Sequence, residues 1–377
     1  QRTMQPAKGS NEVIVNGDIS KVTGDLFGDD SFDLLRVRPS LDGLLALNAE
    51  DQATINGLTD IIRTAKGLKD GQVLDLATQY GVRLSANNIV GDVNLETFLF
   101  EGVIVEGGGS TGSIISIGNS RLGDSATIVG KKDLVQGGSK DDILIGGPNE
   151  GDIKGGKGND ILVSGTGSET LSGQAGADVY VFKGEWGRDT VKSLSITETA
   201  RDTLNFSLSD KDLRYYFRDG QIYVGQGSFD TTDLKFSSTN TVTAEKGTFG
   251  GIINKIVLSS TPGTTQEFVF GNDWGRTTIE VPEGTSPNLT LDFSNTYEEL
   301  RFEFKADGSL IVTKLGGLQD IAKDTLPDKV VNAKSIIITK IDENTRIITG
   351  SNSNIYRVEE FEVKGTHTGA DSATTLT

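Results

Sequence analysis

The segment GGSKDDILIGGPNEGDIKGGKGNDILV, residues 137–163, decides the fold of this chain because it repeats its own pattern every nine residues. Glycine pairs begin at Gly137, Gly146 and Gly155, and each pair is followed by polar residues and then by a short apolar run. Stepping by nine residues in both directions from Gly155 gives the unit G-G-x-G-x-D-x-U-x, in which U is apolar. The eighth position is apolar in seven successive units: Ala126, Val135, Leu144, Ile153, Leu162, Leu171 and Tyr180.

This unit predicts a tight turn of six residues followed by a strand of three. Glycines at its first, second and fourth positions permit positive φ angles and close approach of neighbouring backbones. A single unit cannot bury its own apolar residue, so successive units must stack into a solenoid. Two units then form one coil of 18 residues, with turns on alternate edges.

The sixth position of the unit carries the acidic residues, and the 18-residue coil sorts them onto two edges. One edge carries Asp124, Asp142, Asp160 and Asp178; the other carries Asp133, Gly151 and Glu169, so only the first is acidic in every coil. Carboxylates stacked at the strand spacing of about 5 Å repel one another unless a cation lies between them. Calcium accepts about six to eight hard oxygen ligands, both carboxylates and carbonyls.

The repeated unit resembles that of the RTX family (repeats in toxin, haemolysin-type calcium-binding proteins), most strongly over residues 137–181. The resemblance implies a parallel β-roll that holds Ca²⁺ between the loops of adjacent coils. It assigns the ligands to Asp142, Asp160, Asp178 and Asp124, with loop carbonyls around Gly138, Lys140, Gly156 and Gly158. Two departures weaken the pattern, because Lys140 replaces a glycine at the fourth position and Gly151 replaces the aspartate at the sixth.

The rest of the chain divides into regions of different character. Residues 11–17 and 33–40 are strand-like, whereas residues 48–66 place Ile55, Leu58, Ile61, Ile62 and Ala65 on one helical face, ended by Gly67. Residues 72–80 are predicted to form a second short helix, and residues 97–109 return to strand-like alternation. We therefore expect a mixed α/β module over residues 1–100 and the β-roll over residues 101–183.

A longer repeat follows the roll. YVFKGEWGRDTV at residues 180–191 matches FVFGNDWGRTTI at residues 268–279, and both tryptophans, Trp186 and Trp274, lie at the same position of this match. The pairs Asp219-Gly220 and Asp307-Gly308 lie between alternating apolar runs and predict hairpin turns. We expect two copies of a β module, residues 184–266 capping the roll and residues 267–377 following it. The predicted fold class is mainly β.

Composition excludes several classes of function. The chain has 36 lysines and arginines against 53 aspartates and glutamates, a net charge of −17, which disfavours nucleic acid and anionic membrane surfaces. It has no cysteine, and no run of about 18 apolar residues that could insert into a membrane. The G-x-S-x-G match at residues 108–112 lacks a histidine base, because the single histidine is His367 in a polar tail. We therefore do not expect an enzyme.

These features favour a secreted, calcium-dependent structural or adhesive protein of a bacterial cell surface, matrix or surface layer. The resemblance implies export by type I secretion and an extracellular location. The expected partners are calcium ions, and other copies of the chain or cell-surface glycans are candidates. Two alternatives remain open: the non-catalytic RTX region of a secreted enzyme of the polysaccharide-modifying or lipase type, and a carbohydrate-binding module that uses Trp186 and Trp274.

Overall fold

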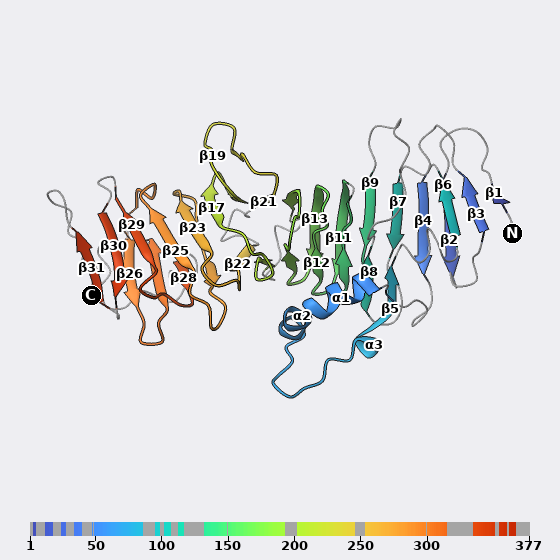
Figure 1. The fold of residues 1–377 in the computed structure, drawn as a ribbon, viewed down its shortest axis with the longest axis horizontal. Helices are drawn as coiled ribbons and strands as arrows, with labels where there is room; N and C mark the ends of the chain where they lie inside the picture. Colours follow the sequence, from blue (N-terminus) through green and yellow to red (C-terminus); the bar gives the residue numbers. More distant parts are fainter. Residues whose placement is uncertain are drawn as a thin grey trace. The chain divides into compact units, whose positions relative to one another are not determined.

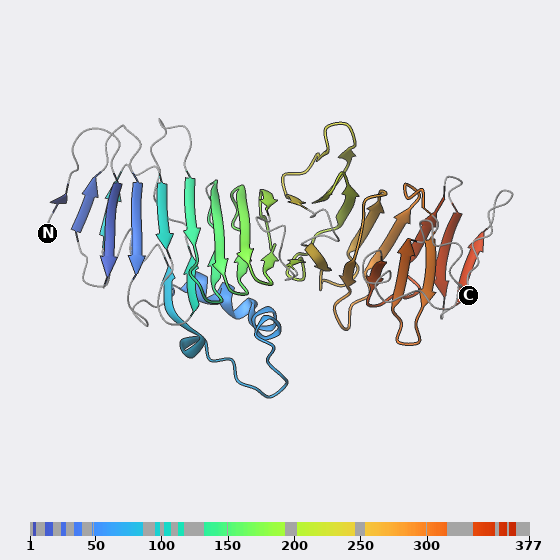
Figure 2. The same ribbon diagram turned by 180° about the vertical axis from the view of Figure 1, so that it is seen from behind.

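The computed structural model describes residues 3–4, 12–17, 24–27, 34–39, 47, 49–85, 95–98, 102–106, 112–116, 132–148, 150–192, 202–245, 253–298, 300–314, 335–350, 354–359 and 362–366. It is mainly β, as predicted, and the chain divides into two compact units (Figures 1 and 2). The first unit contains residues 1–181 and 185–200, and the second contains residues 182–184 and 201–377. The four domains expected from the sequence stay a prediction.

The repeats form a roll of two parallel sheets in the first unit. One sheet contains β9 (Lys132–Gln136), β11 (Gly151–Lys157) and β13 (Glu169–Ala175), and the other contains β10 (Ile143–Ile145), β12 (Ile161–Val163) and β14 (Val179–Val181). Leu144 is in register with Leu162, and Leu162 with Tyr180, which confirms the coil of 18 residues. These eighth-position side chains are all fully buried between the sheets. The roll therefore forms because each coil supplies the next with one layer of apolar core.

Strands from earlier in the sequence extend this roll beyond the regular repeats. β2 (Glu12–Gly17), β4 (Leu34–Pro39) and β7 (Gly102–Glu106) pair in parallel in the order β2-β4-β7-β9. β5 (Tyr80–Ser85) and β8 (Gly112–Ser116) extend the other sheet beside β10. β1 (Thr3–Met4), β3 (Gly24–Phe27) and β6 (Leu95–Phe98) form a separate parallel sheet. The boundary expected at residue 100 does not interrupt the roll, because β4 and β7 pair across it.

One nonapeptide more than the sequence predicted, half a coil, follows β14. β15 (Arg188–Val191) pairs with β13 in register, with Thr170 opposite Thr190 and Leu171 opposite Val191. The segment GEWGRDTVK, residues 184–192, is a further nonapeptide shifted by two residues from the regular frame. A Cβ added to Gly187 would lie 1.9 Å from the carbonyl oxygen of Gly167, just as one added to Gly176 would lie 1.6 Å from that of Gly158. The period therefore resumes after residue 181.

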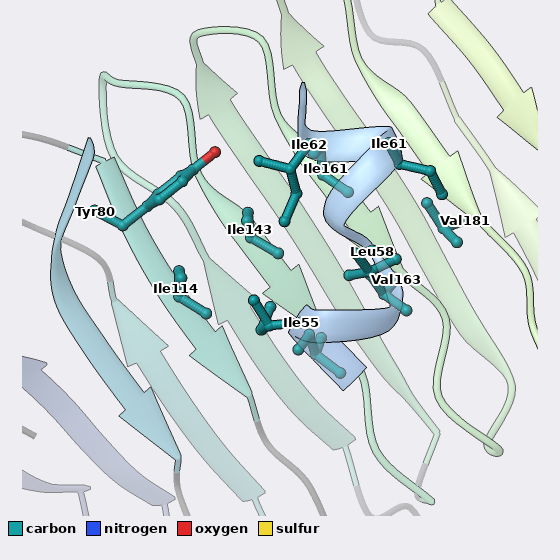
Figure 3. Close-up of a cluster of buried hydrophobic side chains, with 11 residues drawn as sticks. Ile55, Leu58, Ile61, Ile62, Tyr80, Ile114, Ile143, Ile161, Val163 and Val181 are labelled. Atoms are coloured by element: carbon teal, nitrogen blue, oxygen red, sulfur yellow. The ribbon is translucent and has the colours of Figure 1, made fainter. Parts of the chain in front are cut away.

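Two helices, α1 (Ala49–Gly57) and α2 (Thr59–Ala65), cover the second sheet of the roll (Figure 1). Their predicted apolar face is confirmed, because Ile55, Leu58, Ile61 and Ile62 are buried against this sheet (Figure 3). The sheet offers apolar residues at the seventh and ninth positions of its repeats, including Ile143, Ile145, Ile161 and Val163. The first sheet has Asp152, Lys154, Thr170 and Ser172 at these positions and is not apolar on that face.

The helical segment deviates from one continuous helix, because α1 ends at Gly57 and α2 begins at Thr59. Gly67 has φ of 63° just after α2, which agrees with its predicted role as a stop signal. The second predicted helix is shorter than residues 72–80: α3 spans Leu76–Gln79, and Tyr80 already belongs to β5. Buried Asp51 of α1 accepts a hydrogen bond of 2.7 Å from the Ser116 hydroxyl of β8, which fixes the helix to the sheet.

We expect Leu58→Ala to lower the free energy of unfolding of the calcium-loaded chain by about 2–5 kcal/mol, the usual cost of a large-to-small change in a core. Leu58 has no exposed surface and packs between α1 and the sheet of the roll. Urea unfolding followed by circular dichroism measures the loss. Val73→Ala is the matched control, since Val73 is 82% exposed and its change should stay within about 0.5 kcal/mol. Equal stability of the two variants would show that the helices do not stabilise the roll.

The second unit is also built from two parallel sheets. β16 (Asp202–Asn205), β22 (Ile253–Val257), β24 (Thr277–Glu280) and β28 (Ser335–Ile338) form one parallel row. β17 (Leu213–Arg218), β23 (Thr265–Phe270), β25 (Asn288–Phe293) and β29 (Arg346–Thr349) form the other. Strands of the first predicted copy are followed in each row by strands of the second, and the pairing of β22 with β24 joins the two copies in one sheet.

Antiparallel strands are added to these rows by hairpins. β17 pairs with β18 (Gln221–Gly225), which pairs with β21 (Thr241–Glu245), and β26 (Leu300–Phe304) pairs with β27 (Leu310–Lys314). β19 (Phe229–Asp230) pairs with β20 (Lys235–Phe236), and β30 (Asn354–Glu359) with β31 (Glu362–Thr366). Asp219 and Gly220 have φ of 55° and 72°, as the predicted tight hairpin turn requires.

Candidate metal centre

Three predicted ligands form a ladder along one edge of the roll. Asp142, Asp160 and Asp178 each directly precede a strand of the second sheet, and their side chains are at most 2% exposed. The backbone N–H of Asp142 donates to Oδ1 of Asp160 at 2.8 Å, and that of Asp160 donates to Oδ1 of Asp178 at 2.8 Å. Each carboxylate is therefore held against the coil before it, which places the three in register on the same edge.

The ladder begins with a serine at the position where the sequence predicted an aspartate. The backbone N–H of Ser113 donates to Oδ1 of Asp142 at 2.6 Å, because Ile114 of β8 is in register with Ile143. The predicted ligand Asp124 lies outside the described residues. On this edge the nine-residue frame therefore does not extend beyond Asp142, since β8 with its buried Ile114 and Ile115 occupies the layer next to β10.

The glycines at the first position of the repeat leave room for the carboxylates. A Cβ added to Gly155 would lie 2.2 Å from Oδ2 of Asp160, so any larger residue would displace this carboxylate. Oδ2 of Asp142 accepts a hydrogen bond of 2.7 Å from the N–H of Gly138. Oδ2 of Asp160 is buried and makes no hydrogen bond, which leaves a strong oxygen donor for a ligand inside the loop.

Backbone carbonyls of adjacent loops surround the same edge. A Cβ added to Gly156 would lie 2.2 Å from the carbonyl oxygen of Gly138, and one added to Gly158 would lie 2.5 Å from that of Lys140. Lys140 is exposed, so its side chain does not enter the loop, and the lysine at the fourth position leaves the backbone contact intact. In the part of the chain that the structure describes, no three acidic or histidine side chains converge as a metal-binding group. A cation on this edge would therefore be held by carboxylates together with backbone carbonyls, which are ligands that calcium accepts.

The electrostatics of the ladder favour a positive charge. Burial, reinforced by the charges of Asp178 and Asp142, raises the pKa of Asp160 to about 9. Burial also raises the pKa of Asp142 to about 6, although hydrogen bonds from Gly138 and Ser113 act in the opposite direction. Without a compensating cation these groups would bind protons near neutral pH. The donor set therefore fits a hard divalent ion.

The other edge of the roll has a pair of acids, Glu169 and Asp189, of which only Glu169 was identified from the sequence. Gly151 is in register with both Asp133 and Glu169, which confirms the predicted order on this edge. Glu169 continues the pattern, because its backbone N–H donates to Oδ1 of Asp189 at 2.8 Å. Asp189 was missed because two extra residues shift the frame; the shifted sequence GEWGRDTVK, with aspartate at its sixth position, is the signal that could have identified it.

Several other sequence features give no site in the described part of the chain. Most of the G-x-S-x-G match and His367 lie outside the described residues. Trp186 and Trp274 are 0% and 2% exposed, so neither presents the open aromatic face that a sugar-binding platform needs. Among the described residues, no helix combines the length and the apolar character needed to cross a bilayer.

Comparison with known protein families agrees with the geometry of the roll. Residues 130–150 and 151–180 match the family model of the RTX calcium-binding nonapeptide repeat (4 copies). A comparison with curated proteins finds no match. The family match covers the loops that carry Asp142, Asp160 and Asp178, and it confirms the nine-residue frame in this region.

Proposed function

We propose that this chain, whose residues 130–180 are RTX calcium-binding repeats, is a secreted structural or adhesive protein of a bacterial cell surface, matrix or surface layer, and that it is not an enzyme. The observation that carries the proposal is the ladder of buried Asp142, Asp160 and Asp178, in which a carboxylate oxygen of Asp160 has no hydrogen bond. Such a ladder is a device for binding cations and for coupling that binding to folding.

The chain's own residues explain how this coupling works. Oδ1 of each aspartate accepts a backbone N–H from the preceding coil, so the carboxylates reach their positions only when the coils are stacked. Calcium, when bound, supplies the positive charge that the ladder lacks and stabilises the folded form by mass action. Extracellular calcium modules bind at about 10⁻⁴–10⁻³ M, so the roll would remain loose inside a cell and fold outside.

Export and location follow from the same reasoning. A chain that folds only at high calcium suits secretion in an unfolded state, and the RTX repeats support a type I route and an extracellular location. The net charge of −17 suits a protein that works among divalent cations at a bacterial surface. Other copies of the chain and cell-surface glycans are its candidate partners.

We expect Asp160→Asn to weaken calcium binding at least about tenfold, because it removes the central charge of the ladder while keeping the shape of the side chain. Calorimetric titration with calcium measures the change. Asp152→Asn is the matched control, since Asp152 lies on β11 outside the ladder, and it should bind calcium like the wild type.

The proposed surface role needs a separate measurement. Fluorescently labelled chain is added to bacterial cells whose surface proteins have been stripped with a chelator. Calcium should restore attachment of the wild type and of Asp152→Asn, but not of Asp160→Asn at the same calcium concentration. Equal calcium affinity of the two variants would reject the ladder as the binding site, and attachment without calcium would reject the proposed role.

A further inference from the structure

The outer face of the first sheet, which is not the sheet that α1 and α2 cover, carries hydroxyl groups on neighbouring strands. Thr170 of β13 lies opposite Thr190 of β15. Both side chains point outward, because Leu171 and Val191 beside them are buried in the core. Ser172 follows on the same face of β13. The face therefore offers hydroxyl groups on adjacent strands, which lie about 4.8 Å apart.

Cations flank these hydroxyl groups on both sides of β13. Lys154 of β11 is in register with Ser172. Lys192 lies on the other side of Ser172, because its backbone N–H donates to the carbonyl oxygen of Leu171 at 2.9 Å. Arg188 begins β15 and is exposed, as is Lys192. We call this surface the basic face and define it by six residues: Lys154, Thr170, Ser172, Arg188, Thr190 and Lys192.

The three cations of the basic face have no acidic partner. In the part of the chain that the structure describes, none of them forms an ion pair, whereas Lys66 and Asp141 of the same unit pair at 2.9 Å. The hydroxyl oxygen of Ser172 is buried and makes no hydrogen bond, although buried hydroxyl groups as a rule have a partner. Asp152 shares this side of β11 but forms no ion pair with Lys154. The roll therefore exposes uncompensated positive charge on a chain whose net charge is −17.

The chemistry of the basic face selects its ligand. Protein–protein interfaces are enriched in aromatic side chains and depleted of lysine and serine, and none of the six residues is apolar or aromatic. The face also lacks an aromatic ring on which a neutral sugar could stack. Lysine and arginine form strong hydrogen bonds with carboxylates, and serine and threonine hydroxyls bond other hydroxyl groups. A polymer that carries both carboxylates and hydroxyl groups is an anionic polysaccharide.

We propose that the basic face binds an anionic, carboxylate-bearing polysaccharide of the bacterial surface. Lys154, Arg188 and Lys192 pair with its carboxylates, and the hydroxyl groups between them bond its sugar rings. The inference rests on the proposed surface role and names the class of ligand through which the roll attaches. It also explains why attachment requires calcium, because the strands that carry Lys154 and Lys192 lie side by side only when the coils are stacked.

Binding of the calcium-loaded full chain is measured on a sensor surface that carries carboxymethyl dextran, with unmodified dextran as the neutral reference. The wild type is compared with Lys192→Gln and with the double variant Lys154→Gln/Lys192→Gln. Lys69→Gln is the matched control, because Lys69 is also an exposed lysine of the first unit and its change alters the net charge equally. A calcium titration of the circular dichroism signal establishes that each variant folds at the wild-type calcium concentration.

The wild type is expected to bind carboxymethyl dextran but not dextran, and added NaCl should weaken the binding by screening. Lys192→Gln should weaken it about threefold, the effect of one exposed ion pair, and the double variant at least about tenfold. Lys69→Gln should stay within about twofold of the wild type.

The outcomes separate this inference from the proposed function. If the basic-face variants bind like the wild type, or if Lys69→Gln weakens binding as much as Lys192→Gln, the inference is wrong while calcium-linked folding stands. Equal binding to dextran, or binding to phosphatidylserine vesicles without binding to carboxymethyl dextran, also overturns it. If a variant does not fold, absence of wild-type binding to carboxymethyl dextran would by itself reject the basic face. A wild-type chain that does not respond to calcium would reject the proposed function as well.

Discussion

Removal of calcium with a chelator is expected to unfold the roll of the first unit while the second unit keeps most of its structure. The described roll buries five carboxyl groups, on Asp142, Asp160, Asp178, Glu169 and Asp189. Each uncompensated buried charge costs about 3–5 kcal/mol, and a typical domain is stable by only about 5–15 kcal/mol. Hydrogen exchange read by mass spectrometry should therefore show loss of protection over residues 132–192, with protection retained over residues 253–298.

The helical cover should respond together with the roll. Leu58 and Ile62 belong to one buried cluster with Ile143 of β10 and Ile161 of β12, so the helices lose most of the sheet surface they pack on when these strands separate. Lys66 at the end of α2 also pairs with Asp141, 2.9 Å away, in the loop beside the ladder. Peptides from residues 49–65 should therefore lose protection at the same chelator concentration as the roll.

Two controls make this result specific. Magnesium at equal concentration should not restore protection, because it is smaller and gives up its water ligands reluctantly. Lower pH should restore part of it: the pKa of Asp160 is about 9 in the folded chain against an ordinary value of 3.8, so the folded chain binds this proton more tightly than the unfolded chain. That stabilising contribution is present below about pH 4 and is lost as pH rises toward about 9. Unchanged protection of residues 132–192 in chelator at neutral pH would contradict the prediction.

Gly176→Ala is expected to destabilise the calcium-loaded roll by about 2–6 kcal/mol, the sum of backbone strain and overpacking. Gly176 has φ of 140°, and a Cβ at this residue would lie 1.6 Å from the carbonyl oxygen of Gly158. The obstacle is the backbone carbonyl of Gly158, which cannot rotate away as a side chain could, so the two loops must separate. The adjacent Ala177 N–H, which donates to Oδ1 of Asn159 at 2.9 Å, would then lose its partner.

A calcium titration of the circular dichroism signal measures this effect as a shift of the folding midpoint to higher calcium. Gly184→Ala is the matched control, because Gly184 also has positive φ, 58°, but an added Cβ would meet no atom within 4 Å. Its cost should be limited to the left-handed backbone penalty of about 1–2 kcal/mol. If both alanine variants shift the midpoint equally, close stacking of the loops does not contribute to calcium-linked folding.

The spacing of residues in the sequence was sufficient to predict the regular part of the roll. Leu144, Leu162 and Tyr180 recur at intervals of 18 residues and form one row of the core, and Asp142, Asp160 and Asp178 consequently form one edge. This inference works because a strict period leaves each coil with the same backbone path. The helical face of Ile55, Leu58 and Ile62 and the Asp219-Gly220 hairpin were predictable for a similar reason, since both depend on residues close in sequence.

The irregular parts of both units depended on contacts that no local pattern encodes. Ser113 takes the ladder position predicted for Asp124 because β8 offers Ile114 and Ile115 to the neighbouring core layer, although 29 residues separate Ser113 from its partner Asp142. Strands before residue 107 and after residue 201 join parallel sheets although their spacing is irregular, since a connecting loop can absorb any number of residues between two strands.

The sequence alone therefore determined the repeating coil, its acidic edge and its calcium chemistry, because these follow from a period that every coil obeys. Only the tertiary structure decided which segments extend the roll, that two helices cover its apolar face, and that Asp189 comes to lie beside Glu169. These arrangements depend on which apolar surfaces remain uncovered once the coils have stacked. Such surfaces exist only in the assembled roll. The two extra residues before Asp189 displace it from the nine-residue frame, so the repeat pattern alone does not identify it.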